Sequence, residues 1–263
     1  TNTFAAGQGF ELSGVGYDIT GHFSRDGARV DPDANPPLRR LLEVGFFCNN
    51  AHLSDEGKSI GDPTEIALMI AGAKAHLNKD QVRRIEEIPF DSATKYMAVL
   101  ADCNGERYIF VKGAPEIVLE MCSRTTDPQG NEQPLQSDEY VEAAKGFARQ
   151  ALRTLGFAFK RVAPDHADLL HEDLHDLSFA GLQGMIDPPK DSAIQAVANC
   201  KSAGIRTVMV TGDHPLTAQA VAQQLGIPAH RVLSGTELNE IDQPALQQEV
   251  EAVSVFARVA PEH

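Results

Sequence analysis

Lys112 and Gly113 end an apolar stretch that could bind a phosphorylated or planar ligand. The four residues before them are Tyr-Ile-Phe-Val, a β-branched and aromatic run that predicts a strand buried on at least one face. Pro115 follows shortly and is typical of the first turn of a helix. Glycine lets a ligand approach the main chain closely, and lysine supplies charge. The alternative is an ordinary strand–turn–helix corner with a solvated lysine.

Phe90 and Lys95 lie on the same predicted sheet. Residues 95–101 are predicted to form a strand, and the turn after it contains Asn104-Gly105, the pair that tight hairpins favour. Antiparallel pairing with the strand that ends at Lys112 would bring Phe90, Lys95 and Lys112 to one end of the sheet. An aromatic face beside two ammonium groups suits a purine nucleotide, because the ring stacks on the base and the cations meet the phosphates. Plain core packing of Phe90 is the alternative.

Glu65 and Arg153 have structural explanations. Asp62-Pro63 predicts a helix start, with Asp62 as N-cap and Glu65 completing a capping box. A helix over about residues 137–155 would place Arg153 in its last turn, where a cation complements the helix dipole. Any ligand role for either residue therefore needs other support.

The segment His171-Glu172-Asp173-Leu174-His175 fits the zinc-binding pattern H-E-x-x-H. It is short and acidic, and no third ligand follows from its spacing. A solvated helical face is the better interpretation, and no metal site is predicted in the chain.

The second part of the chain has a different pattern. From Asp187 onward, apolar strands alternate with helices, which predicts a parallel sheet covered on both faces. Thr211-Gly212-Asp213 follows a strand predicted over residues 206–210 and precedes a helix predicted over residues 215–225. This position, at the carboxyl end of a strand and before a helix N-terminus, favours binding of a phosphate.

The composition excludes several classes of protein. The chain has 263 residues, is 42% hydrophobic and carries a formal net charge of −14, which argues against a nucleic-acid surface. Its four cysteines are widely spaced and indicate buried thiols in a reducing compartment. No apolar stretch approaches the ~20 residues that cross a bilayer, and no secretion signal is evident, so the sequence itself is expected to be soluble.

With these residues in view, the chain resembles the cytoplasmic part of a P-type ATPase of the cation-pumping class, which includes calcium and sodium/potassium pumps. The matching motifs are Gly61-Asp62-Pro63-Thr64-Glu65, Phe90 with Lys95, Lys112-Gly113-Ala114-Pro115-Glu116, Arg153, Asp187-Pro188-Pro189, Thr211-Gly212-Asp213 and Phe256-Ala257-Arg258-Val259. The resemblance implies an α/β protein in two parts. Residues 1–186 would form a nucleotide-binding domain, an antiparallel sheet flanked by helices, and residues 187–263 part of a haloacid-dehalogenase-like phosphorylation domain.

The resemblance also implies a nucleotide site in the first part. Phe90 would stack on adenine, and Glu65 would lie near the base. Lys95, Lys112 and Gly113 would line the pocket.

Further roles are implied for the remaining motif residues. Arg153 would reach the phosphates, and Thr211-Gly212-Asp213 would face the transferred phosphoryl group. Asp187 and Arg258 would lie near the hinge and the nucleotide. Lys190 departs from the family pattern, in which arginine is more usual, and the two differ in bidentate phosphate contact.

The sequence lacks the family's Asp-Lys-Thr-Gly-Thr segment with the phosphorylated aspartate, its Gly-Asp-Gly-x-Asn-Asp segment that helps hold magnesium, and all membrane helices. We therefore expect a fragment that binds ATP or ADP without turnover. The parent protein would use ATP and Mg²⁺, form an aspartyl-phosphate and move a cation across a plasma or inner membrane. The fragment would be its cytoplasmic portion, with the membrane helices, the actuator domain and the rest of the phosphorylation domain as partners.

Two other functions compete with this interpretation. A soluble phosphatase of the dehalogenase-like class is suggested by Thr211-Gly212-Asp213, but it needs an early Asp-x-Asp strand that residues 1–30 do not contain. A scaffold or regulatory module would keep the fold without the pocket. Loss of nucleotide affinity in Lys112→Ala and Phe90→Ala would separate the pump interpretation from the scaffold.

Overall fold

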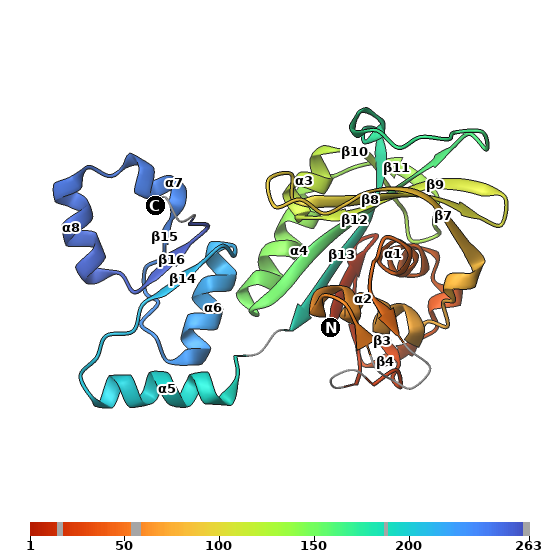
Figure 1. Ribbon diagram of the computed structural model, residues 1–263. Helices are drawn as coiled ribbons and strands as arrows, with labels where there is room; N and C mark the ends of the chain where they lie inside the picture. The colour runs from red at the N-terminus through yellow and green to blue at the C-terminus, as the bar shows by residue number, and fades with distance from the viewer. Residues whose placement is uncertain (15–17, 54–58, 187–188, 260–263) are drawn as a thin grey trace. The chain divides into compact units, whose positions relative to one another are not determined.

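The computed structural model describes residues 1–14, 18–53, 59–186 and 189–259 (Figure 1). The chain divides into two compact units: unit 1 comprises Thr1–Ala144 and Thr154–Met185, and unit 2 comprises Lys145–Arg153 and Ile186–His263. Across the described ranges, no helix has both the length and the apolar character to cross a membrane.

Unit 1 is built on one large, mostly antiparallel sheet. Its strands lie in the order β4-β3-β2-β1-β13-β12-β9-β8-β7, with β10 paired to both β11 and β13. The strands are β1 (Asn2–Ala5), β2 (Gln8–Leu12), β3 (Phe23–Arg25), β4 (Ala28–Val30), β7 (Val82–Ile88), β8 (Tyr96–Cys103), β9 (Glu106–Gly113), β10 (Cys122–Thr126), β11 (Glu132–Pro134), β12 (Leu152–Val162) and β13 (Leu177–Ile186). The short strands β5 (His52–Leu53) and β6 (Ser59–Ile60) form a separate hairpin. The antiparallel sheet predicted for the first part of the chain is confirmed.

The hairpin of β8 and β9 lies near one edge of this sheet, between β12 and the edge strand β7. Its register runs from Tyr96 opposite Gly113 to Cys103 opposite Glu106. Asn104-Gly105 makes the turn, and both residues have positive φ angles, 55° and 88°. Such left-handed pairs match the twist of the flanking strands, which is why Asn-Gly predicts a tight hairpin. The predicted pairing is confirmed.

Helices cover both faces of the sheet. They are α1 (Pro36–Phe47) and α2 (Pro63–Lys74) on one face, and α3 (Pro115–Glu120) and α4 (Ser137–Arg149) on the other (Figure 1). A Cβ on Gly45 of α1 would lie 3.3 Å from the ring of Phe157 in β12 and 3.6 Å from Leu68 of α2, whereas one on the neighbouring Gly156 would lie 3.1 Å from Pro115 of α3. Because successive side chains of a strand point to opposite faces, the two pairs of helices lie on opposite sides.

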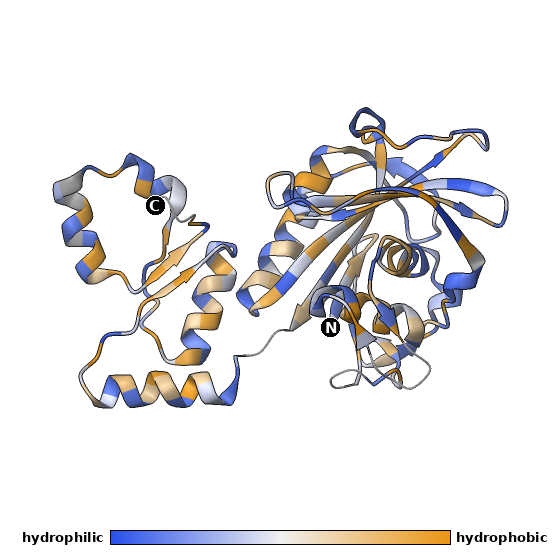
Figure 2. Cartoon of the chain, viewed as in Figure 1, coloured by the Kyte–Doolittle hydropathy of each residue, from blue (hydrophilic) through white to orange (hydrophobic). Residues whose placement is uncertain are grey.

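The helices α1 and α2 begin as their sequences predict. The side chain of Asn35 accepts the amide of Leu38, and Asp62 accepts the amide of Thr64 at 2.8 Å; prolines occupy the first positions of both helices. The main core lies between these helices and the sheet, and α1 is largely hydrophobic (Figure 2). Its large, fully buried members include Phe23, Leu38, Leu41, Leu42, Leu68, Met97, Phe110 and Phe157.

The helix predicted over residues 137–155 is shorter than expected. It ends at Arg149, Ala151 adopts a left-handed φ of 57°, and the chain enters β12 at Leu152. The prediction that Arg153 lies in a last helical turn is therefore wrong: Arg153 is exposed near the start of a strand. Sheet formation overrides the local helical pattern here, since β12 begins at Leu152 and pairs with β9 from Gly156 onward.

Unit 2 contains a small parallel sheet in the order β14-β16-β15. Its elements are α5 (Asp191–Ser202), β14 (Met209–Thr211), α6 (Pro215–Leu225), β15 (Leu233–Ser234), α7 (Gly235–Glu240), α8 (Gln243–Ala252) and β16 (Val255–Ala257). The predicted alternation of strands and helices is confirmed, and α7 is an additional helix. The strands are shorter than predicted, since residues 206–208 precede β14.

The sheet of unit 2 is not covered on both faces within the described residues. Val210, in the middle of β14, is 67% exposed, and Val208 and Ile205 are exposed as well. The expectation that every apolar strand here is buried on both sides is therefore wrong for β14. A hydrophobic strand indicates that both of its faces tend to be buried, but it does not show which element covers each face.

Candidate functional site

A buried ion pair lies where α2 begins and β9 ends. Lys112 Nζ donates to Glu65 Oε1 at 2.5 Å, and the two side chains are only 7% and 19% exposed. Lys112 is opposite Met97 on one side and Phe157 on the other, so it points to the face covered by α1 and α2. A lysine this buried needs a charged partner, and Glu65 provides it. Glu65 thus directs one carboxylate oxygen to Lys112.

Phe90 and Lys95 lie at the same end of the sheet. Phe90 follows the end of β7 by two residues, and Lys95 immediately precedes β8. Since Tyr96 pairs with Gly113, this end of β8 is also the end of β9. The ring of Phe90 is 62% exposed and Lys95 is exposed. The structure therefore brings the predicted aromatic ring and both lysines to one sheet end, and the alternative of Phe90 as core packing is wrong.

The packing of β8 against β9 requires a glycine at position 113. A Cβ at this position would lie 2.5 Å from the carbonyl oxygen of Lys95 and 2.9 Å from Cα of Tyr96. Both are backbone atoms, so neither can rotate away. A glycine here lets β8 and β9 approach, in addition to any approach by a ligand.

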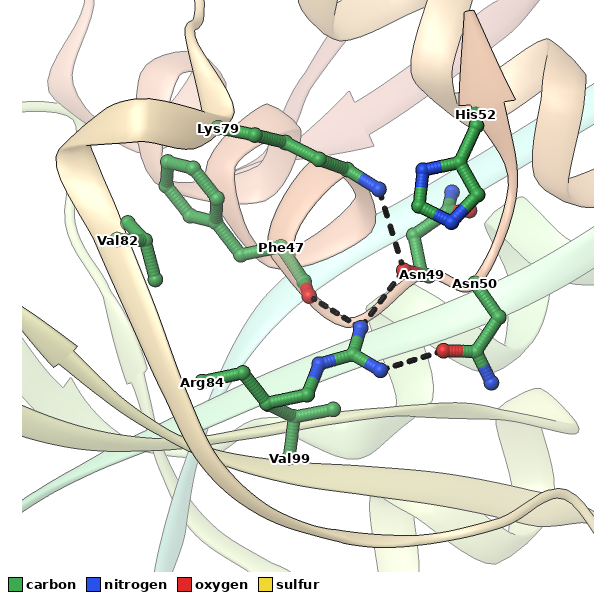
Figure 3. A pocket seen from close by; sticks show the side chains of 8 residues that line it. All are labelled: Phe47, Asn49, Asn50, His52, Lys79, Val82, Arg84 and Val99. Atoms are coloured by element: carbon green, nitrogen blue, oxygen red, sulfur yellow. Dashed lines mark hydrogen bonds between the residues drawn. The ribbon is translucent and has the colours of Figure 1, made fainter.

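A cavity of about 300 Å³ opens on the same face of the sheet (Figure 3). It is lined by Phe47, Asn49, Asn50, His52, Lys79, Val82, Arg84 and Val99. In Figure 3 the side chains of Lys79 and Arg84 converge on the backbone carbonyl of Asn49. Arg84 Nη2 donates to Asn49 O at 2.7 Å and to Phe47 O at 3.4 Å, and Lys79 Nζ donates to Ala51 O at 2.8 Å.

These cations satisfy carbonyl groups that follow the end of α1. The last carbonyls of a helix have no partner within it, and basic side chains commonly supply one. Burial lowers the pKa of Lys79, and the neighbouring Arg84 guanidinium lowers it further. Sequence reasoning missed Lys79, Arg84 and Asn49. The only indication in the sequence was that carbonyl groups at the end of α1 need hydrogen-bond donors. The sequence does not show which distant residues supply those donors.

In unit 2, four predicted residues meet at the carboxyl end of the parallel sheet. Thr211, Gly212 and Asp213 end β14 and follow it, and Arg258 directly follows β16. Thr211 Oγ1 donates to Asp213 Oδ2 at 3.0 Å, and the amide of Arg258 donates to Asp213 O at 3.2 Å. A Cβ on Gly212 would meet nothing within 4 Å, so this edge is open. Open α/β sheets bind ligands at such edges.

Two further residues were predicted for the site, Arg153 and Asp187. Asp187 lies outside the described residues. Arg153 lies near the start of β12 and is grouped with unit 2.

Metal-ligating side chains do not cluster in the parts of the chain that the structure describes: no group of three His, Cys, Asp or Glu residues could hold an ion. The H-E-x-x-H segment forms only a 3₁₀ turn over His171–Asp173. His171 Nδ1 shares a hydrogen bond with the Tyr96 hydroxyl, and His175 Nδ1 lies 2.6 Å from Glu172 O. The two imidazoles thus have other partners and do not share one helical face.

Comparison with known proteins gives two family matches. Residues 37–192 match the model of the P-type ATPase cytoplasmic domain N, and residues 131–260 match that of haloacid dehalogenase-like hydrolases. Among similar proteins, a calcium-transporting ATPase of Bacillus subtilis is 36% identical over 100% of this chain, and the cation-transporting ATPase pma1 of Synechocystis is 41% identical over 98%. Calcium-transporting ATPase 1 of Bacillus cereus is 40% identical over 87%. The chain spans 31%, 30% and 26% of the lengths of these relatives.

Proposed function

The chain belongs to the P-type ATPase family, and from this premise we propose that unit 1 binds ATP or ADP at the sheet end that carries Phe90, Lys95 and Lys112. The observation that carries the proposal is the exposed side chain of Phe90 at the same sheet end as the buried Lys112–Glu65 pair. An exposed aromatic ring can stack on a purine base, which is a matching planar partner.

The two lysines at this sheet end differ in how strongly they can attract a phosphate. Lys112 is neutralised by Glu65 at 2.5 Å, so its ammonium group contributes little attraction to a distant phosphate. Lys95 is exposed, and with the chain's net charge of −14 a local cation is needed to attract a polyphosphate. We assign the base to Phe90 and the Glu65–Lys112 pair, with Gly113 beside them, and the phosphates to Lys95. A contact between Arg153 and the phosphates stays a prediction from the family resemblance.

For unit 2 we propose that Thr211, Gly212 and Asp213 face the transferred phosphoryl group, with Arg258 beside them and Asp187 at the hinge. Mg²⁺ commonly binds one or two carboxylates together with phosphate oxygens. Asp213 could supply one such carboxylate, and Mg²⁺ would neutralise charge on the phosphates when bound.

The whole protein would couple ATP hydrolysis, through an aspartyl-phosphate, to transport of a cation across a membrane. Its membrane helices and actuator domain would be the partners of this cytoplasmic portion. The names of the relatives point to calcium as the first cation to test.

Titration calorimetry and NMR shift mapping test nucleotide binding by unit 1. Three probes separate its parts: ATP, adenosine and tripolyphosphate. We expect Phe90→Ala to weaken ATP and adenosine by about 1–3 kcal/mol, the usual range for loss of base stacking. Lys95→Ala should weaken ATP and tripolyphosphate and leave adenosine unchanged.

Ile19→Ala is the matched control, because Ile19 is another exposed apolar side chain of unit 1. It should bind all three probes like the unmodified chain. Unchanged Phe90, Lys95 and Lys112 resonances at millimolar ATP would overturn the proposal. Equal effects of Ile19→Ala and Phe90→Ala would also remove the assigned role of the ring.

A further inference from the structure

Asn49 lies under the proposed nucleotide site without reaching its surface. The residue is 0% exposed and sits two residues past the end of α1. A fully buried asparagine must satisfy two donors and an acceptor on its side chain, because each unpaired group would cost free energy.

Every group of this side chain has a backbone partner. Nδ2 donates to Gly45 O at 3.1 Å and to Glu65 O at 2.9 Å, and Oδ1 accepts the amide of Ala51 at 2.8 Å. One amide thus joins the last turn of α1, the loop after it and the first turn of α2.

The main chain of Asn49 is held as firmly as its side chain. Its carbonyl oxygen accepts Arg84 Nη2 at 2.7 Å and faces Lys79 Nζ at 3.5 Å. Arg84 comes from β7, the strand whose end leads to Phe90. Asn49 is therefore fixed from the sheet on one side and fixes the backbone of Glu65 on the other.

We propose that Asn49 is a positioning residue that sets the place of Glu65, and through it of Lys112, for nucleotide recognition; this inference rests on the proposed function of unit 1. Glu65 is anchored at its backbone by Asn49 and at its carboxylate by Lys112. A small displacement of the anchored backbone would move the carboxylate of a short, 2.5 Å ion pair. Recognition depends on such placement to within fractions of an ångström.

The first test needs no nucleotide. A buried, hydrogen-bonded lysine ammonium group exchanges slowly with water and can be followed by ¹H–¹⁵N NMR. We expect the unmodified chain to show the Lys112 ammonium resonance, and Asn49→Ser to shift or broaden it. Leu41→Ala is the control for general loss of stability, because Leu41 is equally buried in α1. It should leave the resonance in place, and an unchanged resonance in folded Asn49→Ser would overturn the proposal.

The second test is a double-mutant cycle on ATP affinity. We expect Asn49→Ser to raise the Kd for ATP about three- to tenfold, in line with loss of one or two buried hydrogen bonds. In a Glu65→Gln background, Asn49→Ser should change the Kd for ATP much less, because the carboxylate that Asn49 is proposed to position has already been removed. A full effect in that background would mean that Asn49 does not act through Glu65.

The two tests fail independently. Absence of ATP binding by the unmodified chain would overturn the proposed function, and the Lys112 resonance would still decide whether Asn49 positions the pair. If Asn49→Ser does not fold, the side-chain amide of Asn49 in the unmodified chain replaces it. That amide should exchange slowly and change its shift when ATP binds. An Asn49 amide that stays unchanged at saturating ATP would contradict the coupling.

Discussion

Units 1 and 2 bury their hydrophobic residues to very different extents. Unit 1 encloses a continuous core between its sheet and α1 and α2, with Phe110 and Phe157 fully buried. Among its described residues, unit 2 has small clusters around Ala218 and Leu233 and leaves Val210 of its edge strand 67% exposed. We expect unit 1 to hold the residues of a binding site rigidly. The conformation of the open edge of unit 2 should depend more on the ligand or protein segment that covers it.

The largest expected effect is in amide hydrogen exchange. Amides of β8 and β9 should exchange only through global unfolding, because both strands are buried and paired on both sides. Amides of residues 206–211 should exchange much faster through local opening, because β14 is a short edge strand. Mass spectrometry of exchange time courses checks this. Equal protection of the two segments would remove the distinction between the units.

The second prediction compares two apolar side chains. Phe110→Ala should lower the free energy of unfolding of unit 1 by about 3–5 kcal/mol, the range for a buried phenylalanine whose loss leaves a cavity. Val210→Ala should change that of unit 2 by less than about 0.5 kcal/mol, because the side chain is mostly in water. Urea unfolding followed by circular dichroism measures both. A large loss in Val210→Ala would mean that β14 is covered after all.

The third prediction compares the glycines at the two proposed sites. Gly113→Ala should cost about 1–3 kcal/mol of unit 1 stability, because the added Cβ meets backbone of Lys95 and Tyr96. Gly212→Ala should leave the stability of unit 2 within about 0.5 kcal/mol, because its surroundings are open. Thermal unfolding of both variants checks this. Similar losses would show that the edge of unit 2 is as closely packed as that of unit 1.

Local patterns predicted much of the fold. Asn104-Gly105 predicted the hairpin of β8 and β9, and Asp62 predicted the start of α2. The prediction for Arg153 was wrong because Ala151 turns the chain into β12, and the partner of β12 is a strand about forty residues earlier in the sequence. Local helix propensity carries no information on such a partner.

The candidate site was only partly predictable for the same reason. The convergence of Phe90, Lys95 and Lys112 follows from a hairpin and its neighbour, both local features. The pairing of Lys112 with Glu65 joins positions 47 residues apart, and a good capping motif offered a different partner for Glu65. Asn49 gave no indication in the sequence, because its importance lies in three backbone groups that only the folded chain brings together.

The smallest expected effect concerns a local interaction in unit 2. Ser234 caps α7, and the carboxylate of Glu237 accepts its amide at 2.7 Å and its hydroxyl at 2.6 Å. These hydrogen bonds lower the pKa of Glu237 below its usual 4.5. A carboxyl group whose pKa is lowered by folding stabilises the fold above its usual pKa, and this contribution is lost as the pH falls through the native value.

Ser234→Ala should therefore cost unit 2 about 0.5–1 kcal/mol at pH 7, a typical cap contribution, and less at pH 3. Part of the effect should survive in acid, because the Ser234 hydroxyl also accepts the amide of Glu237 at 3.3 Å. Thr236→Ala is the control on the same helix and should show no such pH dependence, since Thr236 is exposed. Urea unfolding at both pH values measures the difference. If Ser234→Ala cost the same at pH 3 as at pH 7, the hydrogen bond between the Ser234 hydroxyl and the Glu237 carboxylate would contribute nothing to the stability of unit 2.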